Sequence, residues 1–83
     1  MTRYRLTKNA YLTVVSAFHY NRHFEKGQVF EKDGVLGDYV SLVTDYYRVF
    51  VHKDRLKDCF ELIWGDTSLF KDSPYYTEPD DEN

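Results

Sequence analysis

The sequence predicts a small, mainly β, single domain, and three observations support this class. The chain has 83 residues, which is enough for one hydrophobic core and too few for two. Hydrophobic residues make up 42% of it and aromatic residues 18%, which is too apolar for a disordered chain of modest net charge. Short runs rich in β-branched and aromatic residues are separated by Gly, Asp and Asn, as in chains built of strands and turns.

The first strand is predicted at residues 11–20, where β-branched residues are frequent and the pattern places one set of side chains on a single face: Leu12, Val14, Phe18 and Tyr20. Residues 21–27 are polar and end in Lys-Gly, which indicates a loop. A short second strand follows at 29–32 and stops at Asp33-Gly34.

The middle of the chain predicts an antiparallel hairpin. Residues 34–38 contain two glycines and connect to an extended run at 39–44. Asp45 marks a tight turn into a second run at 46–51. The strand period places one ring of the Tyr46-Tyr47 pair inward and the other outward.

Residues 52–64 allow two predictions. We favour a short helical turn near 52–58, followed by a strand at 59–64 with Phe60, Leu62 and Trp64 facing the core. The alternative is an α+β fold of four strands and a helix at 54–64 that begins at Asp54 and ends at Gly65. The predicted core contains Val14, Phe18, Val40, Leu42, Val49, Val51, Leu56 and Phe60.

Charge divides the chain unevenly. Residues 1–32 carry six Lys or Arg and two acids, whereas residues 72–83 carry five acids and no base. We therefore expect one domain at residues 1–71 and an acidic, flexible tail at 72–83. An acidic end can also serve solubility alone.

The predicted order of elements resembles that of an SH3-like barrel, and four local motifs add to the likeness over residues 12–63. Residues 17–21 (Ala-Phe-His-Tyr-Asn) resemble the Ala-Leu-Tyr-Asp-Tyr motif, and residues 24–28 (Phe-Glu-Lys-Gly-Gln) are similar to Phe-Lys-Lys-Gly-Glu. Residues 37–42 (Gly-Asp-Tyr-Val-Ser-Leu) resemble Gly-Asp-Trp-Trp-Leu, and residues 50–56 fall where Tyr-Ile-Pro-Ser-Asn-Tyr-Val would lie. The resemblance implies a small five-stranded SH3-like barrel with a helical turn near 52–58.

The departures from this family concern its ligand groove. SH3 domains bind polyproline II segments between aromatic rings. Here Tyr39 replaces the first Trp of the motif, His52 replaces the Pro, and Arg55 replaces the groove Tyr. A proline-rich ligand is therefore not expected.

The sequence predicts neither an enzyme nor a metal or cofactor site. Structural zinc sites usually bring their ligands in close pairs such as Cys-x2-Cys or His-x3-His. Three residues separate His19 from His23, but on an extended strand running into a loop these side chains would lie far apart, and His52 and Cys59 form no such pair. Asp58 and Glu61 flank the single cysteine and disfavour a reactive thiolate, so we expect Cys59 in the core. Phosphate-binding and catalytic-triad motifs are missing from the sequence. Asp80 and Asp81 lie in the predicted tail, which offers no rigid frame for acid–base chemistry.

Localisation is predicted to be cytoplasmic. The N-terminal residues are basic but are not followed by the apolar stretch and cleavage site of a signal peptide. One cysteine cannot form an internal disulfide, which agrees with a reducing compartment. No apolar run is long enough to span a bilayer. We expect a monomer or weak dimer that does not bind membranes.

Aromatic and Arg side chains commonly anchor protein interfaces, and they indicate a protein-binding role here. The candidate partner-binding residues are Arg3, Tyr4, Arg5, Tyr46, Tyr47, Arg48, Tyr75, Tyr76, Asp80 and Asp81. The compact, Tyr-rich chain also resembles the short early proteins of tailed bacteriophages, many of which disable host enzymes or defence systems. The resemblance implies an inhibitor of a host enzyme such as a toxin ribonuclease or another nucleic-acid-processing protein.

Two alternatives stay open. Small β-barrels with basic loops and exposed aromatics often bind RNA or single-stranded nucleic acid. The candidate residues for that role are Arg3, Arg5, Lys8, Arg22 and Lys26. A structural role in a virion or another assembly is the third possibility, and no specific residue supports it.

Overall fold

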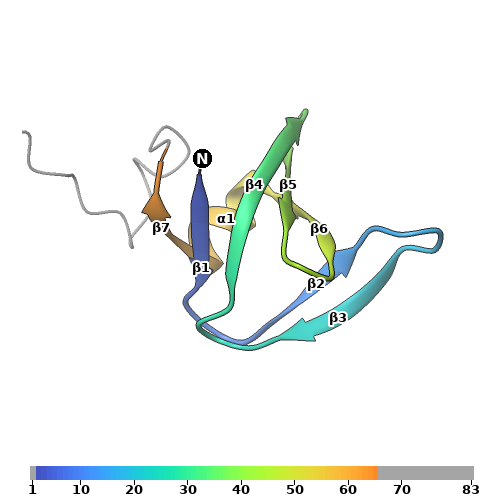
Figure 1. Ribbon diagram of the computed structural model, residues 1–83, viewed down its shortest axis with the longest axis horizontal. Coiled ribbons are helices and arrows are strands. Elements are labelled where there is room, and N and C mark those ends of the chain that lie inside the picture. The colour runs from blue at the N-terminus through green and yellow to red at the C-terminus, as the bar shows by residue number, and fades with distance from the viewer. Residues whose placement is uncertain (1, 66–83) are drawn as a thin grey trace, which may run out of the picture.

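The computed structural model describes residues 2–65, so the predicted tail at 72–83 lies outside the described residues. Within this range the chain forms seven strands and one short helix (Figure 1). The prediction of a mainly β fold is confirmed. The elements are β1 (Arg3–Leu6), β2 (Ala10–Val14), β3 (Tyr20–Phe24), β4 (Val29–Leu36), β5 (Tyr39–Val43), β6 (Arg48–His52), α1 (Lys53–Cys59) and β7 (Phe60–Trp64).

All seven strands of residues 2–65 belong to one antiparallel sheet in the order β3-β2-β6-β5-β4-β1-β7. The strands β3 and β7 stand at opposite ends of this order and do not pair with each other. The sheet is therefore not closed into a barrel, and the predicted count of five strands is wrong. Figure 1 shows the reason, because the β2–β3 hairpin extends away from the rest of the sheet.

The strand β1 was not predicted, although its sequence carries a strand pattern. Arg3 and Arg5 alternate with Tyr4 and Leu6, and only the latter two are buried. β1 pairs with β4 on one side and β7 on the other, so it lies inside the sheet. The basic residues Arg3 and Arg5 therefore occupy the solvent face of an inner strand.

The prediction of one strand at 11–20 and a loop at 21–27 is wrong. Residues 15–19 form the tip of a hairpin between β2 and β3, and the register runs from Ala10↔Phe24 to Val14↔Tyr20. The Ser16 hydroxyl donates to the Phe18 carbonyl at 2.7 Å and accepts from the Phe18 amide at 3.3 Å. These bonds close a turn at the tip and leave Phe18 82% exposed, so Phe18 is not a core residue.

The strand β4 is longer than predicted and includes Gly34. Its register with β5 shifts between Lys32 and Gly34, so Asp33 occupies a bulge. The turn into β5 needs only Gly37 and Asp38, and Gly37 adopts a positive φ of 61° that suits glycine. The predicted hairpin of β5 and β6 is confirmed by the register Tyr39↔His52 to Val43↔Arg48.

The favoured prediction for residues 52–64 is confirmed, and the helix at 54–64 is wrong. The His52 side chain accepts a hydrogen bond from the Asp54 amide at 3.2 Å and caps α1. Phe60 returns to extended geometry at φ −125° and ends the helix. Its ring is buried and Leu62 is half-buried, but Trp64 is 66% exposed and does not face the core.

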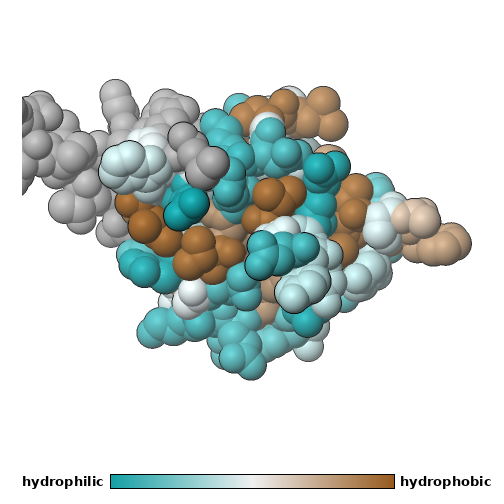
Figure 2. All heavy atoms as spheres, in the orientation of Figure 1, coloured by the Kyte–Doolittle hydropathy of each residue, from teal (hydrophilic) through white to brown (hydrophobic). Residues whose placement is uncertain are grey.

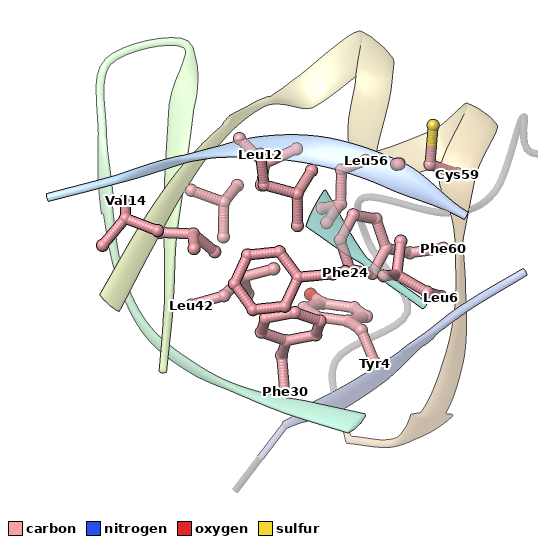
Figure 3. Close-up of a cluster of buried hydrophobic side chains, with 14 residues drawn as sticks. Tyr4, Leu6, Leu12, Val14, Phe24, Phe30, Leu42, Leu56, Cys59 and Phe60 are labelled. Carbon is pink, nitrogen blue, oxygen red and sulfur yellow. The ribbon is translucent and has the colours of Figure 1, made fainter. Parts of the chain in front are cut away.

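The core lies between the strands and α1 (Figure 3). The Tyr4, Phe24 and Phe30 rings gather at its centre, with aliphatic side chains around them. Edge-to-face contacts join Phe24 to Phe30 at 5.4 Å and Phe30 to Phe60 at 5.5 Å between ring centres. All predicted core residues except Phe18 are buried. Cys59 is also buried, as the sequence predicted.

Candidate functional site

A groove runs between the end of β3, the start of β4 and the turn at residues 44–47. It consists of three adjoining cavities of about 310, 340 and 380 Å³. Gln28 lines all three, Thr44 and Asp45 line the first two, and Arg22 and Phe24 line the last two. Because neighbouring cavities share walls, they form one surface, which we call the aromatic–arginine groove; its main polar and aromatic lining residues are Arg3, Arg22, Gln28, Asp45, Tyr46 and Tyr47.

The Arg22 side chain is fixed against aromatic rings inside the groove. Its guanidinium carbon lies 4.3 Å from the centre of the Tyr47 ring and 4.9 Å from that of Phe24. These two rings contact each other edge to face at 5.7 Å. One guanidinium nitrogen donates to the His23 carbonyl at 2.9 Å. A guanidinium has five N–H donors, so this bond leaves donors for a ligand acceptor.

The turn at 44–47 positions the two tyrosines. The Thr44 hydroxyl accepts hydrogen bonds from the Tyr46 amide at 3.2 Å and the Tyr47 amide at 3.0 Å, and the Thr44 amide donates to the Tyr47 carbonyl at 2.8 Å. Tyr47 packs against the core, whereas Tyr46 is 87% exposed. The prediction of one inward and one outward ring is confirmed.

The other candidate residues near β1 and β6 lie in different settings. Arg3 lines the first cavity of the groove. Tyr4 is completely buried, so its side chain is a core group and is not available to a partner. Arg5 forms an ion pair with Glu61. Arg48 lies 3.3 Å from the Asp33 carboxylate, which reduces the charge it presents to a ligand.

The candidate residues for nucleic-acid binding also lie in different settings. Arg3 and Arg22 line the groove, whereas Arg5, Lys8 and Lys26 do not. Lys8 and Lys26 are exposed. The four remaining candidates of the partner-binding set lie outside residues 2–65: Tyr75, Tyr76, Asp80 and Asp81.

Sequence reasoning missed Gln28 and Asp45 as lining residues, because nothing in their local sequence distinguishes them from turn residues. It also missed two apolar projections. Figure 2 shows hydrophobic atoms at the far end of the β2–β3 hairpin and at the tip of the β4–β5 hairpin. Phe18 occupies the first tip and is 82% exposed, and Leu36 occupies the second and is 68% exposed.

Two of the histidines contact neighbouring side chains or backbone within the fold. His23 contacts Tyr11 at 5.2 Å between ring centres, and His52 caps α1 and contacts Tyr39. Among the described residues, no group of three or more His, Cys, Asp or Glu side chains is arranged to hold a metal ion. The helix found in residues 2–65 is too short and too polar to cross a membrane.

Comparisons of the chain with protein-family models, with curated proteins and with solved structures give no match.

Proposed function

We propose that this chain is a non-enzymatic protein-binding module and that the aromatic–arginine groove is its contact surface. One observation carries the proposal: the Arg22 guanidinium is held on the Tyr47 ring at 4.3 Å beside Tyr46, which is 87% exposed. Tyr and Arg dominate the binding energy of protein interfaces because they combine large area with directed donors.

The rigidity of the groove supports this role. Binding costs free energy for each side chain that it immobilises, about 0.5–1.5 kcal/mol for a side chain rich in rotamers. Arg22 and Tyr47 are already held by ring contacts and by the bonds of the 44–47 turn. They can therefore contact a partner with little further loss of entropy.

We further propose that the chain is a phage-encoded inhibitor of a host enzyme that processes nucleic acid, such as a toxin ribonuclease. The support is the charge division of the sequence, in which residues 72–83 carry five acids and no base. Such a segment matches the phosphate-binding surface of a basic enzyme in charge. The segment and the groove would then contact different parts of the target.

We also propose that the fold is an opened relative of the SH3-like architecture. The pairing of β1 with both β4 and β7, and the meander of β4, β5 and β6 before a helical turn, support this relation. One of the four SH3-like motifs does not fit this relation. Residues 17–21 lie at and beside a hairpin tip, whereas the resemblance places them on a first strand.

Nucleic-acid binding is the second candidate function. Residues 2–65 carry ten Lys or Arg and eight acids, and an exposed ring beside a cation suits a stacked base. However, Glu31, Asp45 and Glu25 line the same groove. These carboxylates would repel phosphates, so the groove favours a protein partner.

A capture experiment with a matched control tests the proposed function. Full-length chain and two variants, Tyr46→Ser and Tyr11→Ser, are immobilised and incubated with host lysate, with and without prior nuclease treatment. Both tyrosines are exposed, at 87% and 62%, but Tyr11 lies outside the groove. We expect Tyr46→Ser to weaken capture of the partner at least about fivefold, the effect of losing 1 kcal/mol at an interface, and Tyr11→Ser to leave it unchanged. Equal capture by all three proteins, or capture that nuclease treatment abolishes, would contradict the proposal.

A further inference from the structure

The strand β3 has an open edge whose backbone groups can be identified. β3 stands at the end of the sheet and pairs only with β2 within residues 2–65. The Val15 amide donates to the Arg48 carbonyl at 2.8 Å, so odd-numbered residues of β2 point their backbone groups toward β6 and even-numbered ones toward β3. The register Leu12↔Arg22 then turns the Arg22 backbone toward β2. The N–H and C=O groups of Asn21 and His23 consequently point outward.

This edge has little of the usual protection. Natural proteins blunt edge strands with proline, lysine and other charges, or bulges. Tyr20–Phe24 contains no proline, lysine or bulge, and its one charged residue is Arg22 on the core-facing side, which would favour an acidic residue on an added strand. At the other end of the sheet, the pairing of β7 with β1 is irregular between Arg3 and Tyr4. The β3 edge carries one local bond, from the Arg22 guanidinium to the His23 carbonyl.

The groove lies on the side of β3 that an added strand would cover. Tyr20, Arg22 and Phe24 share the core-facing side of the strand, as the burial of Phe24 shows, and Arg22 and Phe24 line two cavities of the groove. Alternate side chains of a strand paired with β3 would therefore point into the groove. The residue directly opposite Arg22 would have its Cβ about 4.5–5.5 Å from that of Arg22.

We propose that the β3 edge accepts an extended segment of the partner protein as an eighth strand, with an Asp or Glu opposite Arg22 and apolar residues two positions before and after it. This inference rests on the proposed function and specifies its ligand. The main-chain bonds to Asn21 and His23 supply affinity, and the side chains in the groove supply selectivity. The carboxylate meets a guanidinium that the Tyr47 and Phe24 rings already hold in place.

A second copy of this chain is a poorer occupant of the same edge. Antiparallel pairing of two β3 strands about a two-fold axis at Arg22 would place the two Arg22 residues directly opposite each other. Like charges at directly opposed positions destabilise a strand pair. An acidic segment from a different protein avoids this repulsion.

The edge can be blocked without breaking the sheet. Asn21→Pro removes an N–H that points outward, and proline is tolerated at such positions of edge strands. Asn21→Ala is the matched control, because both variants lose the bond from the Thr13 hydroxyl to the Asn21 amide oxygen but only proline loses the backbone donor. The probe is a displayed library of random nonapeptides, selected on the full-length chain.

We expect the selected peptides to share an acid flanked at two residues on each side by apolar side chains. Their affinity should fall at least tenfold with Asn21→Pro and with Arg22→Gln, and stay within twofold with Asn21→Ala. On the wild-type chain, they should slow hydrogen exchange of the Asn21 and His23 amides, a readout that does not depend on any variant folding. Peptides without the acid, unprotected edge amides, or an empty selection would overturn the inference. Loss of lysate capture with Tyr46→Ser but not with Asn21→Pro would overturn it while leaving the proposed function intact.

Discussion

At the scale of single residues, aromatic contacts decide which side chains hold the molecule together and which remain available to a ligand. Phe24 contacts the Phe30 and Tyr47 rings and also lies under the Arg22 guanidinium. It thus connects the core to the groove. Phe18, on a hairpin tip, has 82% of its surface exposed. Two residues of one type therefore differ in role because of where the chain turns.

This difference predicts opposite effects of truncation. Phe24→Ala should lower the free energy of unfolding by about 3–5 kcal/mol, the usual cost of removing a buried phenyl ring. Phe18→Ser should change it by no more than about 0.5 kcal/mol, as for other exposed positions. Denaturant titrations of the two variants and the wild type measure both values. Equal destabilisation by the two changes would contradict the hairpin between β2 and β3.

The outcome for Phe18 shows what the residue pattern could not reveal. Residues 11–20 read as one amphipathic strand because Leu12, Val14 and Phe18 fit the period of two. The bonds that close the hairpin come from the Ser16 hydroxyl to Phe18, and serine at a strand position carries no distinct signal. Arg22 was predicted as a candidate binding residue only because of its charge. Its contact with the Tyr47 ring could not be predicted, because Tyr47 lies 25 positions away in the sequence.

At the scale of elements, the turn at 44–47 is the part of the hairpin that positions the candidate site. Thr44 supplies its hydroxyl to two amides and its own amide to the Tyr47 carbonyl. The turn therefore sets the direction of Tyr46 and the depth of Tyr47.

The hairpin of β5 and β6 could be predicted from the sequence, because apolar residues alternate on both sides of a clear turn signal. The polar strand β3 could not, since its exposed edge needs few apolar residues.

Removal of the Thr44 hydroxyl should loosen this turn. Thr44→Val keeps the shape of the side chain but leaves the Tyr46 and Tyr47 amides without their acceptor, and each such bond contributes about 0.5–1.5 kcal/mol. We expect a loss of about 1–3 kcal/mol in the free energy of unfolding, since two bonds of that size are removed. Thr44→Ser retains the hydroxyl and should retain most of the stability. Partner capture should follow the same order, and a valine variant as stable as the serine variant would show that the hydroxyl does not hold the turn.

At the scale of the whole molecule, the hydrophobic core and the candidate binding surface have different positions in the sheet. The core is enclosed by strands from both halves of the chain and by α1, whereas the β3 edge lies at one end of an open sheet and the groove runs from β3 to the start of β4. The barrel was predicted from the order of elements, but closure depends on which strand ends meet in space. β2 pairs with β3 and β6, so the hairpin carries its outer strand away from β7. Local sequence does not encode that direction.

Charge at this scale provides a test that separates protein from nucleic-acid binding. Deleting residues 72–83 removes five acids and no base, so the net charge changes from −3 to +2. If these acids contact a basic enzyme, the truncated chain should associate with it more slowly and bind it more weakly, and Asp80→Asn with Asp81→Asn should reproduce part of the loss. If the chain binds RNA instead, the deletion relieves repulsion from phosphates, and affinity for RNA should rise with a steeper dependence on salt. Binding of the full-length and truncated chains to the captured enzyme and to single-stranded RNA, each at two salt concentrations, measures both effects. An unchanged affinity for the enzyme would remove the acidic segment from the proposed mechanism and leave inhibition to the aromatic–arginine groove.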